Sequence, residues 1–366
     1  MTLIASTRTH TALSPAARAT LSDTESAAAM ATSCTPAGAA LRLTREVAAG
    51  RFRISRRLGL RHAGSRDVTI SGEWCGDQCA PTVVVAGGIS ADRHVAASAR
   101  YSAPGWWAAL AGPHRALDPT RYRLLAIDWL GIEGDLDVPI DGADQAAAIV
   151  AVLDHLQISR AAAFVGASYG GMVGLQFAAA NPDRLGRLVV ISAAHRPHPY
   201  ASAWRGLQRR ILALGRATGA EAEALSLARQ LAMLSYRTPA EFGERFDTAP
   251  AVRGWSVECA SDAYLGACGA SFVDRFHPTA WLRLSESIDL HRVEPSAVTV
   301  ATTAIAIAED RLVPCADVAE LVALLGGPGE LLVIHSKYGH DAFLKEPETI
   351  GRLVRAALSG VDGGAA

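Results

Sequence analysis

The sequence predicts an α/β fold in which a doubly wound, mostly parallel sheet carries a helical insertion. Short apolar runs alternate with helix-like segments along most of the chain, and this alternation stops between residues 196 and 290. Strand–helix alternation is typical of parallel sheets, because each crossover between parallel strands needs a connection as long as a helix. A length of 366 residues fits one large domain with an insertion.

The predicted strands are near-continuous apolar runs, as expected where helices cover both faces of a parallel sheet. Between them, apolar residues recur with the period of a helix. The predicted strands are residues 82–85, 124–127, 163–165, 188–191, 298–308 and 331–334, and the predicted helices are residues 144–156, 171–180, 315–325 and 347–358.

The break in the alternation predicts a lid. It contains helix-like stretches rich in Ala, Leu and Arg at 203–214 and 220–236, but no convincing core strand. The segment begins after one strand and ends before the next, so it would lie over the carboxyl ends of the strands, where open α/β sheets bind ligands. We therefore expect an α/β core of residues 46–195 and 291–360, with a helical lid of residues 196–290.

The first 45 residues differ from the rest of the chain. Residues 1–45 are rich in Ala, Thr and Ser and show no sustained apolar period. They lack a basic segment followed by an apolar core, so they do not indicate a secretory signal. We expect a disordered N-terminal extension without a role in function.

Composition and charge exclude several classes of protein. Lys and Arg number 35 against 36 Asp and Glu, for a net charge of −1, whereas nucleic-acid binders normally carry a basic excess. The sequence contains no stretch of 18 apolar residues, so it predicts no membrane-spanning helix. The six cysteines are sparse and form no CxxC pair, so no metal site is predicted and a cytoplasmic protein is favoured.

A nucleophile is predicted at residues 166–170, which read Gly-Ala-Ser-Tyr-Gly. This G-x-S-x-G motif lies between an apolar strand and a helix-like run, where a strand must reverse into a helix within a few residues. Such a turn brings backbones so close that only small residues fit beside the serine, whose hydroxyl is then exposed at the edge of the sheet. Ser168 is the predicted nucleophile.

A serine needs a base within hydrogen-bond reach, and the base needs an orienting carboxylate. In α/β-hydrolase folds these groups follow the serine in the order acid, then histidine. Asp310 follows the predicted strand at 298–308, and His340 follows the last predicted strand. They are the predicted acid and base, with Glu309 as the alternative acid and His335 as the alternative base.

Acyl transfer also needs hydrogen-bond donors for the oxyanion of the tetrahedral intermediate. The backbone N–H of Tyr169, directly after the nucleophile, is one predicted donor. The second should come from the loop after the first predicted strand, where we choose Ile89. These residues predict acyl chemistry, but they leave the acceptor open, because water would make a hydrolase and an alcohol a transferase.

Several segments together are similar to one known family. The chain resembles the α/β-hydrolase-fold homoserine O-acyltransferases of methionine biosynthesis, in order from about residue 83 to residue 358. In that family Ser168 would be the acylated nucleophile, with Asp310 and His340 as the other triad members. The segments that carry the resemblance are residues 88–95, 104–107, 112–113, 168–172, 228–229 with 235–237, 272–276, 284–291 and, most specifically, Tyr-Gly-His-Asp-Ala-Phe-Leu at 338–344.

The resemblance also implies an amino-acid site. Arg209 matches a lid arginine that holds the carboxylate of homoserine, with Arg210 as an alternative, and Asp341 matches the carboxylate that receives the ammonium group. One cation and one anion at a fixed separation suit a zwitterion. The alternatives are a solvated helix face for Arg209 and a helix N-cap for Asp341.

Two departures from the family pattern bear on the acyl donor. Phe-His-Pro-Thr-Ala-Trp occupies residues 276–281, and Tyr169 stands where Met is common. Both resemble a branch associated with succinyl donors. A succinyl group ends in a second carboxylate and ought to need another cation near the acyl pocket. The sequence does not select among Arg93, Arg196 and Arg237.

The resemblance therefore predicts transfer of a succinyl group from succinyl-CoA to homoserine. Alternatives are an acetyl donor, serine as acceptor, a serine esterase or thioesterase, and a catalytically silent binding protein. No metal and no resident cofactor are implied, because coenzyme A arrives and leaves as part of a substrate. Acyl-CoA and homoserine are the expected partners, and we expect a homodimer, since lidded acyltransferases of this kind often dimerise through the lid.

Overall fold

Eight strands form one sheet in the computed structural model, which describes residues 47–361. Six neighbouring strands of this sheet, β4, β3, β5, β6, β9 and β10, run parallel to one another. This arrangement confirms the predicted fold class. The order across the sheet is β1 (Ala49–Leu60), β2 (Gly64–Cys75), β4 (Arg123–Ile127), β3 (Thr82–Ala86), β5 (Ala163–Ala167), β6 (Leu188–Ile191), β9 (Thr302–Ile307) and β10 (Gly329–Ile334).

The sequence did not predict the long antiparallel hairpin of β1 and β2 at one edge of the sheet. In β1, buried positions such as Ile54 and Leu60 are separated by exposed polar ones, so the strand lacks the continuous apolar run that marked the others. β2 pairs antiparallel with β4 and thereby extends the parallel sheet.

Helices cover both faces of the sheet. Alternate residues of a strand point to opposite faces. Val84 and Phe164 pack on the face shared with α1 and α2, whereas Val83 and Val165 pack on the face shared with α10. The core helices are α1 (Gly142–His155), α2 (Tyr169–Ala180), α8 (Cys315–Leu324), α9 (Ala342–Lys345) and α10 (Pro347–Ala357), with single 3₁₀ turns at η2 (Pro182–Arg184), η3 (Pro295–Ala297) and η4 (Gly339–Asp341).

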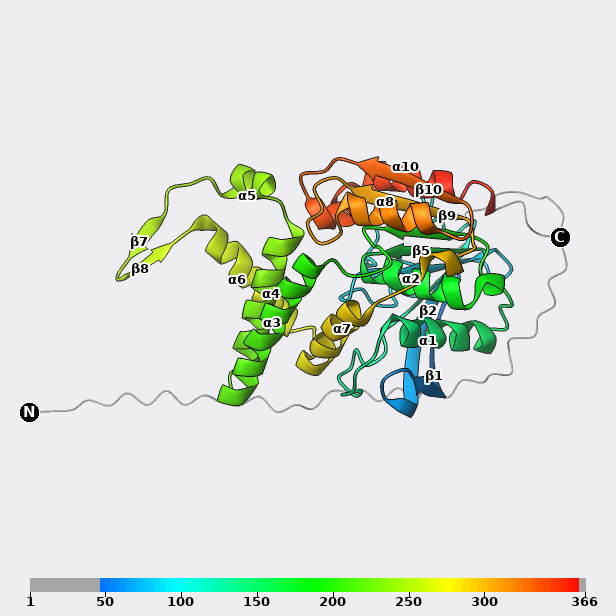
Figure 1. Cartoon of the computed structure of the whole chain (residues 1–366), viewed down its shortest axis with the longest axis horizontal. Helices are drawn as coiled ribbons and strands as arrows, with labels where there is room; N and C mark the ends of the chain where they lie inside the picture. Colours follow the sequence, from blue (N-terminus) through cyan, green and yellow to red (C-terminus); the bar gives the residue numbers. More distant parts are fainter. Residues whose placement is uncertain (1–46, 362–366) are drawn as a thin grey trace, which may run out of the picture. The chain divides into compact units, whose positions relative to one another are not determined.

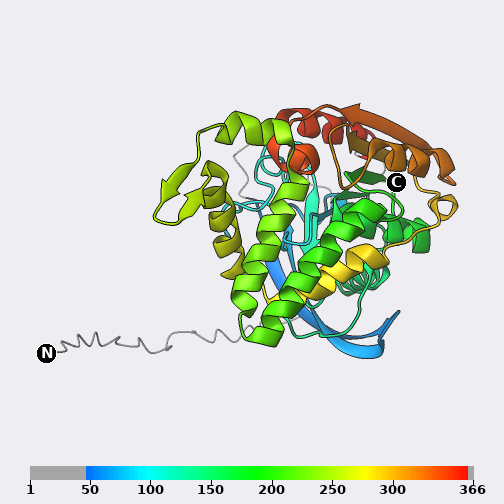
Figure 2. The same cartoon turned by 60° about the vertical axis from the view of Figure 1, so that its left-hand side comes forward.

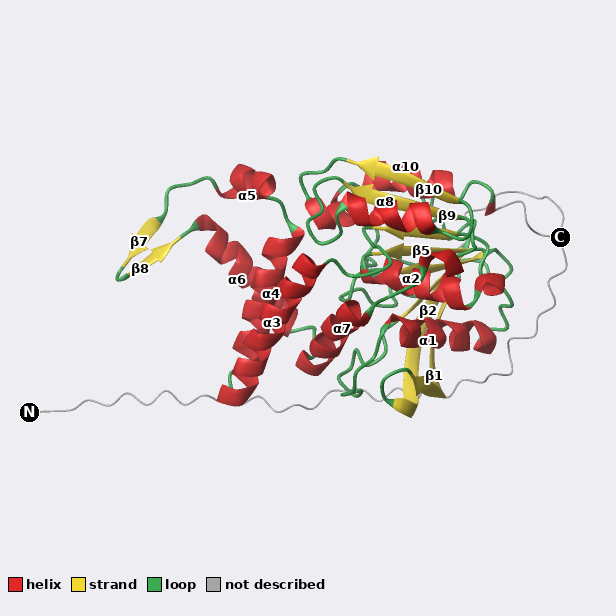
Figure 3. Ribbon diagram, in the orientation of Figure 1, coloured by secondary structure: helices red, strands yellow, loops and turns green. Residues whose placement is uncertain are grey.

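The segment between β6 and β9 is largely helical and lies beyond the ends to which the arrows of β5, β9 and β10 point (Figure 1). Its long helices α3 and α4 pack against each other (Figure 2). A small hairpin that the sequence did not predict interrupts the helices (Figure 3). The elements are α3 (Pro199–Thr218), α4 (Glu221–Tyr236), α5 (Pro239–Phe246), β7 (Ala251–Arg253), β8 (Ser256–Glu258), α6 (Ala260–Val273) and α7 (Pro278–Leu290).

The chain leaves and re-enters the core at adjacent points. The backbone N–H of Val293 donates to the carbonyl of His195 at 2.9 Å, and His291 Nε2 lies 3.0 Å from the carbonyl oxygen of Ala194. His291 is 1% exposed, and burial lowers its pKa to about 4. The two ends of the lid are thus joined through a neutral, buried imidazole.

The strand β5 turns sharply into α2 at Ser168, whose φ of 54° and ψ of −121° are unusual for a residue with a side chain. Glycines flank this turn because the backbones lie close together. A Cβ at Gly170 would lie 2.2 Å from the carbonyl oxygen of Ala86, and one at Gly166 would lie 2.3 Å from the carbonyl oxygen of Gly170. The geometry is that of a nucleophile elbow.

We predict that Gly170→Ala strongly destabilises the fold, because the new methyl group would meet backbone atoms that cannot move independently. The matched control is Gly206→Ala in α3, where nothing lies within 4 Å of the added Cβ. That change should stabilise the protein by about 0.5–1 kcal/mol, since alanine favours a helix interior over glycine. Urea unfolding of both variants checks the prediction, and equal stabilities for the two would contradict it.

We also predict that His291 makes the fold sensitive to acid. Its unfolded pKa of about 6.5 exceeds the folded pKa of about 4. Stability is therefore complete above pH 6.5 and falls as the pH drops toward 4, because only the unfolded state takes up the proton. The slope approaches about 1.4 kcal/mol per pH unit between the two pKa values, so roughly 2 kcal/mol should be lost between pH 6.5 and pH 4.5.

Urea unfolding at pH 7 and pH 4.5 measures this loss. His291→Asn should show a smaller drop between the two pH values than the unsubstituted protein. His335→Asn, at an exposed histidine, serves as the control and should retain the full drop. An undiminished drop in His291→Asn would refute the assignment.

Candidate active site

The structure brings Ser168, His340 and Asp310 into one chain of hydrogen bonds. Ser168 Oγ lies 2.8 Å from His340 Nε2, and His340 Nδ1 lies 2.7 Å from Asp310 Oδ2. His340 and Asp310 are 6% and 5% exposed. Nucleophile, base and orienting carboxylate therefore have the geometry that acyl transfer requires.

Each member stands at the end of a parallel strand. Ser168 follows β5, Asp310 follows β9, and His340 follows β10, so all three emerge at the same edge of the sheet. The amides of Leu312 and Val313 donate to Asp310 Oδ1 at 2.8 and 3.0 Å. These bonds fix the carboxylate and leave its other oxygen for the imidazole.

The alternative acid and base, Glu309 and His335, interact with each other instead. His335 Nδ1 lies 2.9 Å from Glu309 Oε1, and the His335 side chain is 80% exposed. Glu309 also accepts a hydrogen bond from the amide of Ser336 at 2.8 Å. Neither residue takes the place of Asp310 or His340 beside Ser168.

The charges around His340 favour its protonated form. Burial by itself would lower the pKa of the imidazole, but the charge and hydrogen bond of Asp310 and the charge of Asp341 outweigh it. The pKa of His340 is therefore raised above its ordinary value. A raised pKa makes the imidazole a stronger base toward the serine hydroxyl.

The two predicted oxyanion donors, the amides of Tyr169 and Ile89, have no hydrogen-bond acceptor among residues 47–361. Tyr169 is the first residue of α2, where backbone N–H groups have no partner within the helix. Both residues line the same cavity as Ser168. The phenol of Tyr169 lies 2.6 Å from Ser287 Oγ of α7, so this residue also connects the elbow to the lid.

A cavity of about 460 Å³ lies between the core and the lid, which is the size of a small-molecule site. The core contributes the elbow, the loop after β3 and the loop after β10, and the lid contributes α3, α4 and α7. Among the described residues, one carboxylate lines this cavity, that of Asp341. The lining also carries five cationic side chains, those of Arg205, Arg229, Arg237, Arg275 and Lys345. Such a cavity favours anionic ligands.

The structure corrects the prediction for Arg209. This residue does not line the cavity; its Nη1 donates to Ser285 Oγ at 3.1 Å, and its Nη2 pairs with Asp289 at 2.7 Å. Arg210 is exposed and donates to the carbonyl of Gly206 in its own helix. Arg205, one turn before Arg209, is the arginine of α3 that lines the cavity.

A second cavity arginine was noted in the sequence only as part of a lid segment. Arg229 of α4 is half-buried, and its guanidinium lies over the rings of Tyr236 and Phe272 at 5.4 and 4.9 Å. No carboxylate of the described chain pairs with it. Tyr236 in turn lies 5.9 Å from the imidazole of His340, measured between ring centres. Arg229 is therefore an available cation close to the triad.

Asp341 lies where an amino acid's ammonium group could reach it, in the cavity beside His340. Its Oδ2 is 2.9 Å from Nε of Arg237, whose Nη1 donates to the buried Glu241 at 3.0 Å. Its other oxygen, Oδ1, has no hydrogen-bond partner in the part of the chain that the structure describes. Asp341 directly precedes α9, but its side chain makes no cap hydrogen bond.

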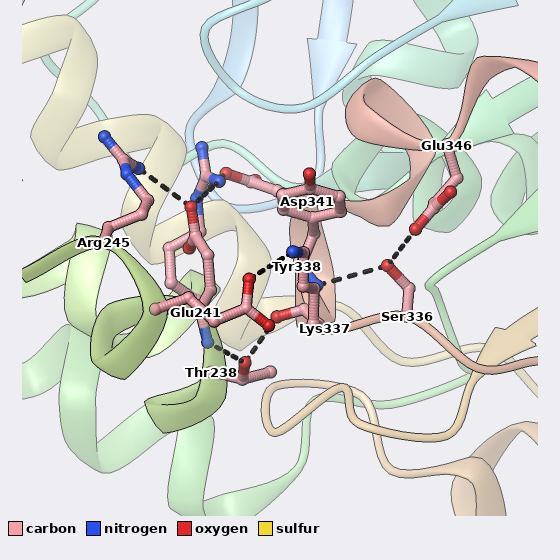
Figure 4. A network of polar contacts seen from close by, with 10 residues as sticks. Thr238, Glu241, Arg245, Ser336, Lys337, Tyr338, Asp341 and Glu346 are labelled. Carbon is pink, nitrogen blue, oxygen red and sulfur yellow. Dashed lines mark hydrogen bonds and ion pairs between the residues drawn. The ribbon is translucent and has the colours of Figure 1, made fainter.

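This ion pair belongs to a network that ties the lid to the loop carrying His340 (Figure 4). Glu241 also accepts a hydrogen bond from Arg245 at 2.8 Å, and the Thr238 hydroxyl donates to the carbonyl of Lys337. On the other side of the loop, Ser336 donates to Glu346 at 2.8 Å. The position of Asp341 is thus fixed from both the lid and the core.

Two of the three arginines considered for a succinyl carboxylate lie outside the cavity lining. Arg93 pairs with Asp128 at 3.0 Å, and Arg196 pairs with Glu320 at 2.6 Å. Arg237 does line the cavity, but Glu241 and Asp341 neutralise it.

Two further features bear on the sequence predictions. No group of three or more His, Cys, Asp or Glu side chains in the described chain is arranged to hold a metal ion. Among the same residues, no helix has the length and apolar character needed to cross a membrane.

Known proteins share this fold and much of this sequence. Residues 81–347 match the family model of the alpha/beta hydrolase fold. A solved structure of homoserine O-acetyltransferase from Bacillus anthracis superposes with a TM-score of 0.75 at 16% identity, over 86% of this chain and 98% of that one. The structure of esterase E22 gives 0.75 at 17% identity, over 85% and 100%. At such low identity these two structures indicate the fold alone.

Sequence relatives narrow the family. A homoserine O-succinyltransferase of Xanthomonas campestris pv. campestris is 56% identical over 301 residues, which cover 82% of each chain. A homoserine O-acetyltransferase of Clavibacter michiganensis subsp. michiganensis is 31% identical over 75% of this chain and 82% of its own. The chain therefore belongs to the homoserine O-acyltransferase family of the α/β-hydrolase fold.

Proposed function

We propose that this protein is a homoserine O-succinyltransferase, which transfers a succinyl group from succinyl-CoA to the hydroxyl of L-homoserine in methionine biosynthesis. The observation that supports it best is the 56% identity with a homoserine O-succinyltransferase over most of both chains. The hydrogen-bonded Ser168, His340 and Asp310 beside a cationic cavity provide the chemistry. No metal and no resident cofactor take part in the proposed reaction.

In the first step Ser168 is acylated. His340 Nε2 accepts the proton of the serine hydroxyl while Oγ bonds to the thioester carbonyl carbon. The amides of Tyr169 and Ile89 stabilise the oxyanion, since neither has another acceptor. The carbon–sulfur bond then breaks, and coenzyme A leaves as a thiol with the proton from His340.

In the second step the acyl group passes to homoserine. Its hydroxyl gives a proton to His340 while the oxygen bonds to the ester carbon, and Ser168 leaves with that proton. Arg229 holds the carboxylate of the amino acid, and Asp341 Oδ1 receives its ammonium group. Holding both charges places the hydroxyl instead of water against the acyl-enzyme.

The acetyl donor remains a second candidate, because relatives near 30% identity are homoserine O-acetyltransferases. Serine as acceptor differs from homoserine by one methylene, which is worth only about 1–3 kcal/mol in a pocket. An esterase would share the triad but would not need Arg229 and Asp341. We further propose a cytoplasmic homodimer joined through the lid.

Intact-mass measurement after a brief pulse of acyl-CoA tests the proposed reaction. Succinyl-CoA should give a succinyl adduct that disappears when homoserine is added and persists with serine. Ser168→Ala should form no adduct, because it lacks the accepting oxygen. An adduct that water removes as fast as homoserine does would instead support an esterase.

For the amino-acid site we predict that Arg229→Gln raises the KM for homoserine by about 10- to 100-fold, because a charged hydrogen bond contributes about 1.5–3 kcal/mol. Formation of the acyl-enzyme should change little, since that step does not involve the amino acid. Steady-state kinetics and the acyl-CoA pulse separate the two effects. Arg209→Gln is the matched control and should keep the homoserine KM; a rise as large as in Arg229→Gln would restore Arg209 as the carboxylate ligand.

A further inference from the structure

One carboxylate in the lid is shared by two arginines. Asp289 of α7 accepts hydrogen bonds from Nε and Nη2 of Arg205 at 2.8 and 2.6 Å, and its other oxygen pairs with Arg209 at 2.7 Å. Ser202 also donates to Asp289 at 2.7 Å. Two cations against one anion leave a positive charge on this part of the lid.

That charge is accessible from the cavity through Arg205. Arg205 lines the cavity together with Ser168 and His340, whereas Arg209 does not. The Arg205 side chain is 12% exposed, and its Nη1 has no acceptor among the described residues. Its charge acts on the imidazole of His340, whose pKa it tends to lower. Arg205 thus combines a free donor with proximity to the reacting atoms.

The buried polar residues around Arg205 belong to the same wall. Gln208 of α3 and Ser285 of α7 line the cavity and are 4% and 2% exposed. Polar side chains in an otherwise aromatic wall are costly unless they have partners. Ser285 Oγ already accepts a hydrogen bond from Arg209 at 3.1 Å, whereas the amide of Gln208 has no hydrogen-bond partner among the described residues and suits a ligand with a polar group at this end.

The other cavity cations have different surroundings. Arg237 is neutralised by Glu241 and Asp341. Arg275 and Lys345 are exposed residues, as expected of groups that meet the phosphates of coenzyme A. Arg229 is assigned to the amino acid. An acyl group with its own carboxylate therefore meets Arg205.

We propose that Arg205 binds the terminal carboxylate of the acyl group and so selects a dicarboxylic acyl donor over an acetyl donor. This inference rests on the proposed function and identifies the residue that determines its donor. The carboxylate hydrogen-bonds to Nη1 of Arg205, while Asp289 holds the rest of the guanidinium. An acetyl group has no charge to place there and leaves Arg205 with water.

The test compares kcat/KM for succinyl-CoA and acetyl-CoA in the unsubstituted enzyme and in Arg205→Gln. We expect the substitution to lower the value for succinyl-CoA by about 10- to 100-fold, with less than a three-fold change for acetyl-CoA and for the homoserine KM. Arg205→Lys keeps the charge and should retain part of the preference. Arg209→Gln, which removes the other partner of Asp289, should leave the preference unchanged.

Each contrary result has a distinct meaning. If Arg205→Gln lowered kcat/KM equally with both donors, Arg205 would be a structural residue. If it raised the homoserine KM with both donors, Arg205 would be an amino-acid ligand. Either result overturns the inference. An acetyl adduct on Ser168 in the variant shows that the site has folded. An unsubstituted enzyme without a preference for succinyl-CoA would overturn the proposed donor itself, and that result needs no variant.

Discussion

The hydrogen bond between Ser168 and His340 is the interaction on which the function depends, and it joins residues 172 positions apart in the chain. It can form only if β5, β9 and β10 end at the same edge of the sheet. Parallel pairing of β9 with both β6 and β10 provides this alignment. The strained backbone of Ser168, held where Gly166 and Gly170 allow close packing, then exposes the hydroxyl to the imidazole.

The lid adds charge to a triad that is otherwise common to many hydrolase folds. Arginines of α3 and α4 enter a cavity whose other walls include aromatic side chains, and only part of their charge is balanced there. Because a bound ligand displaces water from such a cavity, each charge acts more strongly on the ligand than it would at the surface. In the proposed function, the lid therefore supplies the arginines that bind the carboxylates of acceptor and donor, while the core supplies the triad and Asp341.

The sequence was most informative where chemistry and position coincide. Ser168, Asp310 and His340 follow apolar runs, so strand ends alone placed them together. The β1–β2 hairpin was missed because exposed residues separate the buried ones in β1 and because the buried half of β2 includes polar residues such as Ser71 and Glu73. Arg209 was predicted to face the ligand, but the cavity is lined by Arg205 of the same helix and by Arg229 of α4. Which arginine of α3 reaches the cavity depends on how α3 packs against α7, through Asp289. Local sequence does not encode that packing.

The ion pair of Arg237 with Asp341 shows how a binding carboxylate can be both fixed and available. A buried carboxylate without a partner would be costly and would tend to become protonated. Arg237 removes that cost through Oδ2, and the charge of its second partner Glu241 is balanced by Arg245, so the four groups together are neutral. Oδ1 remains open for an ammonium group, whose arrival adds one positive charge beside His340. The same charge would favour the neutral imidazole, which is the form that must accept the proton of the homoserine hydroxyl. In the proposed reaction, binding of the amino acid and activation of its hydroxyl would therefore be coupled through Asp341.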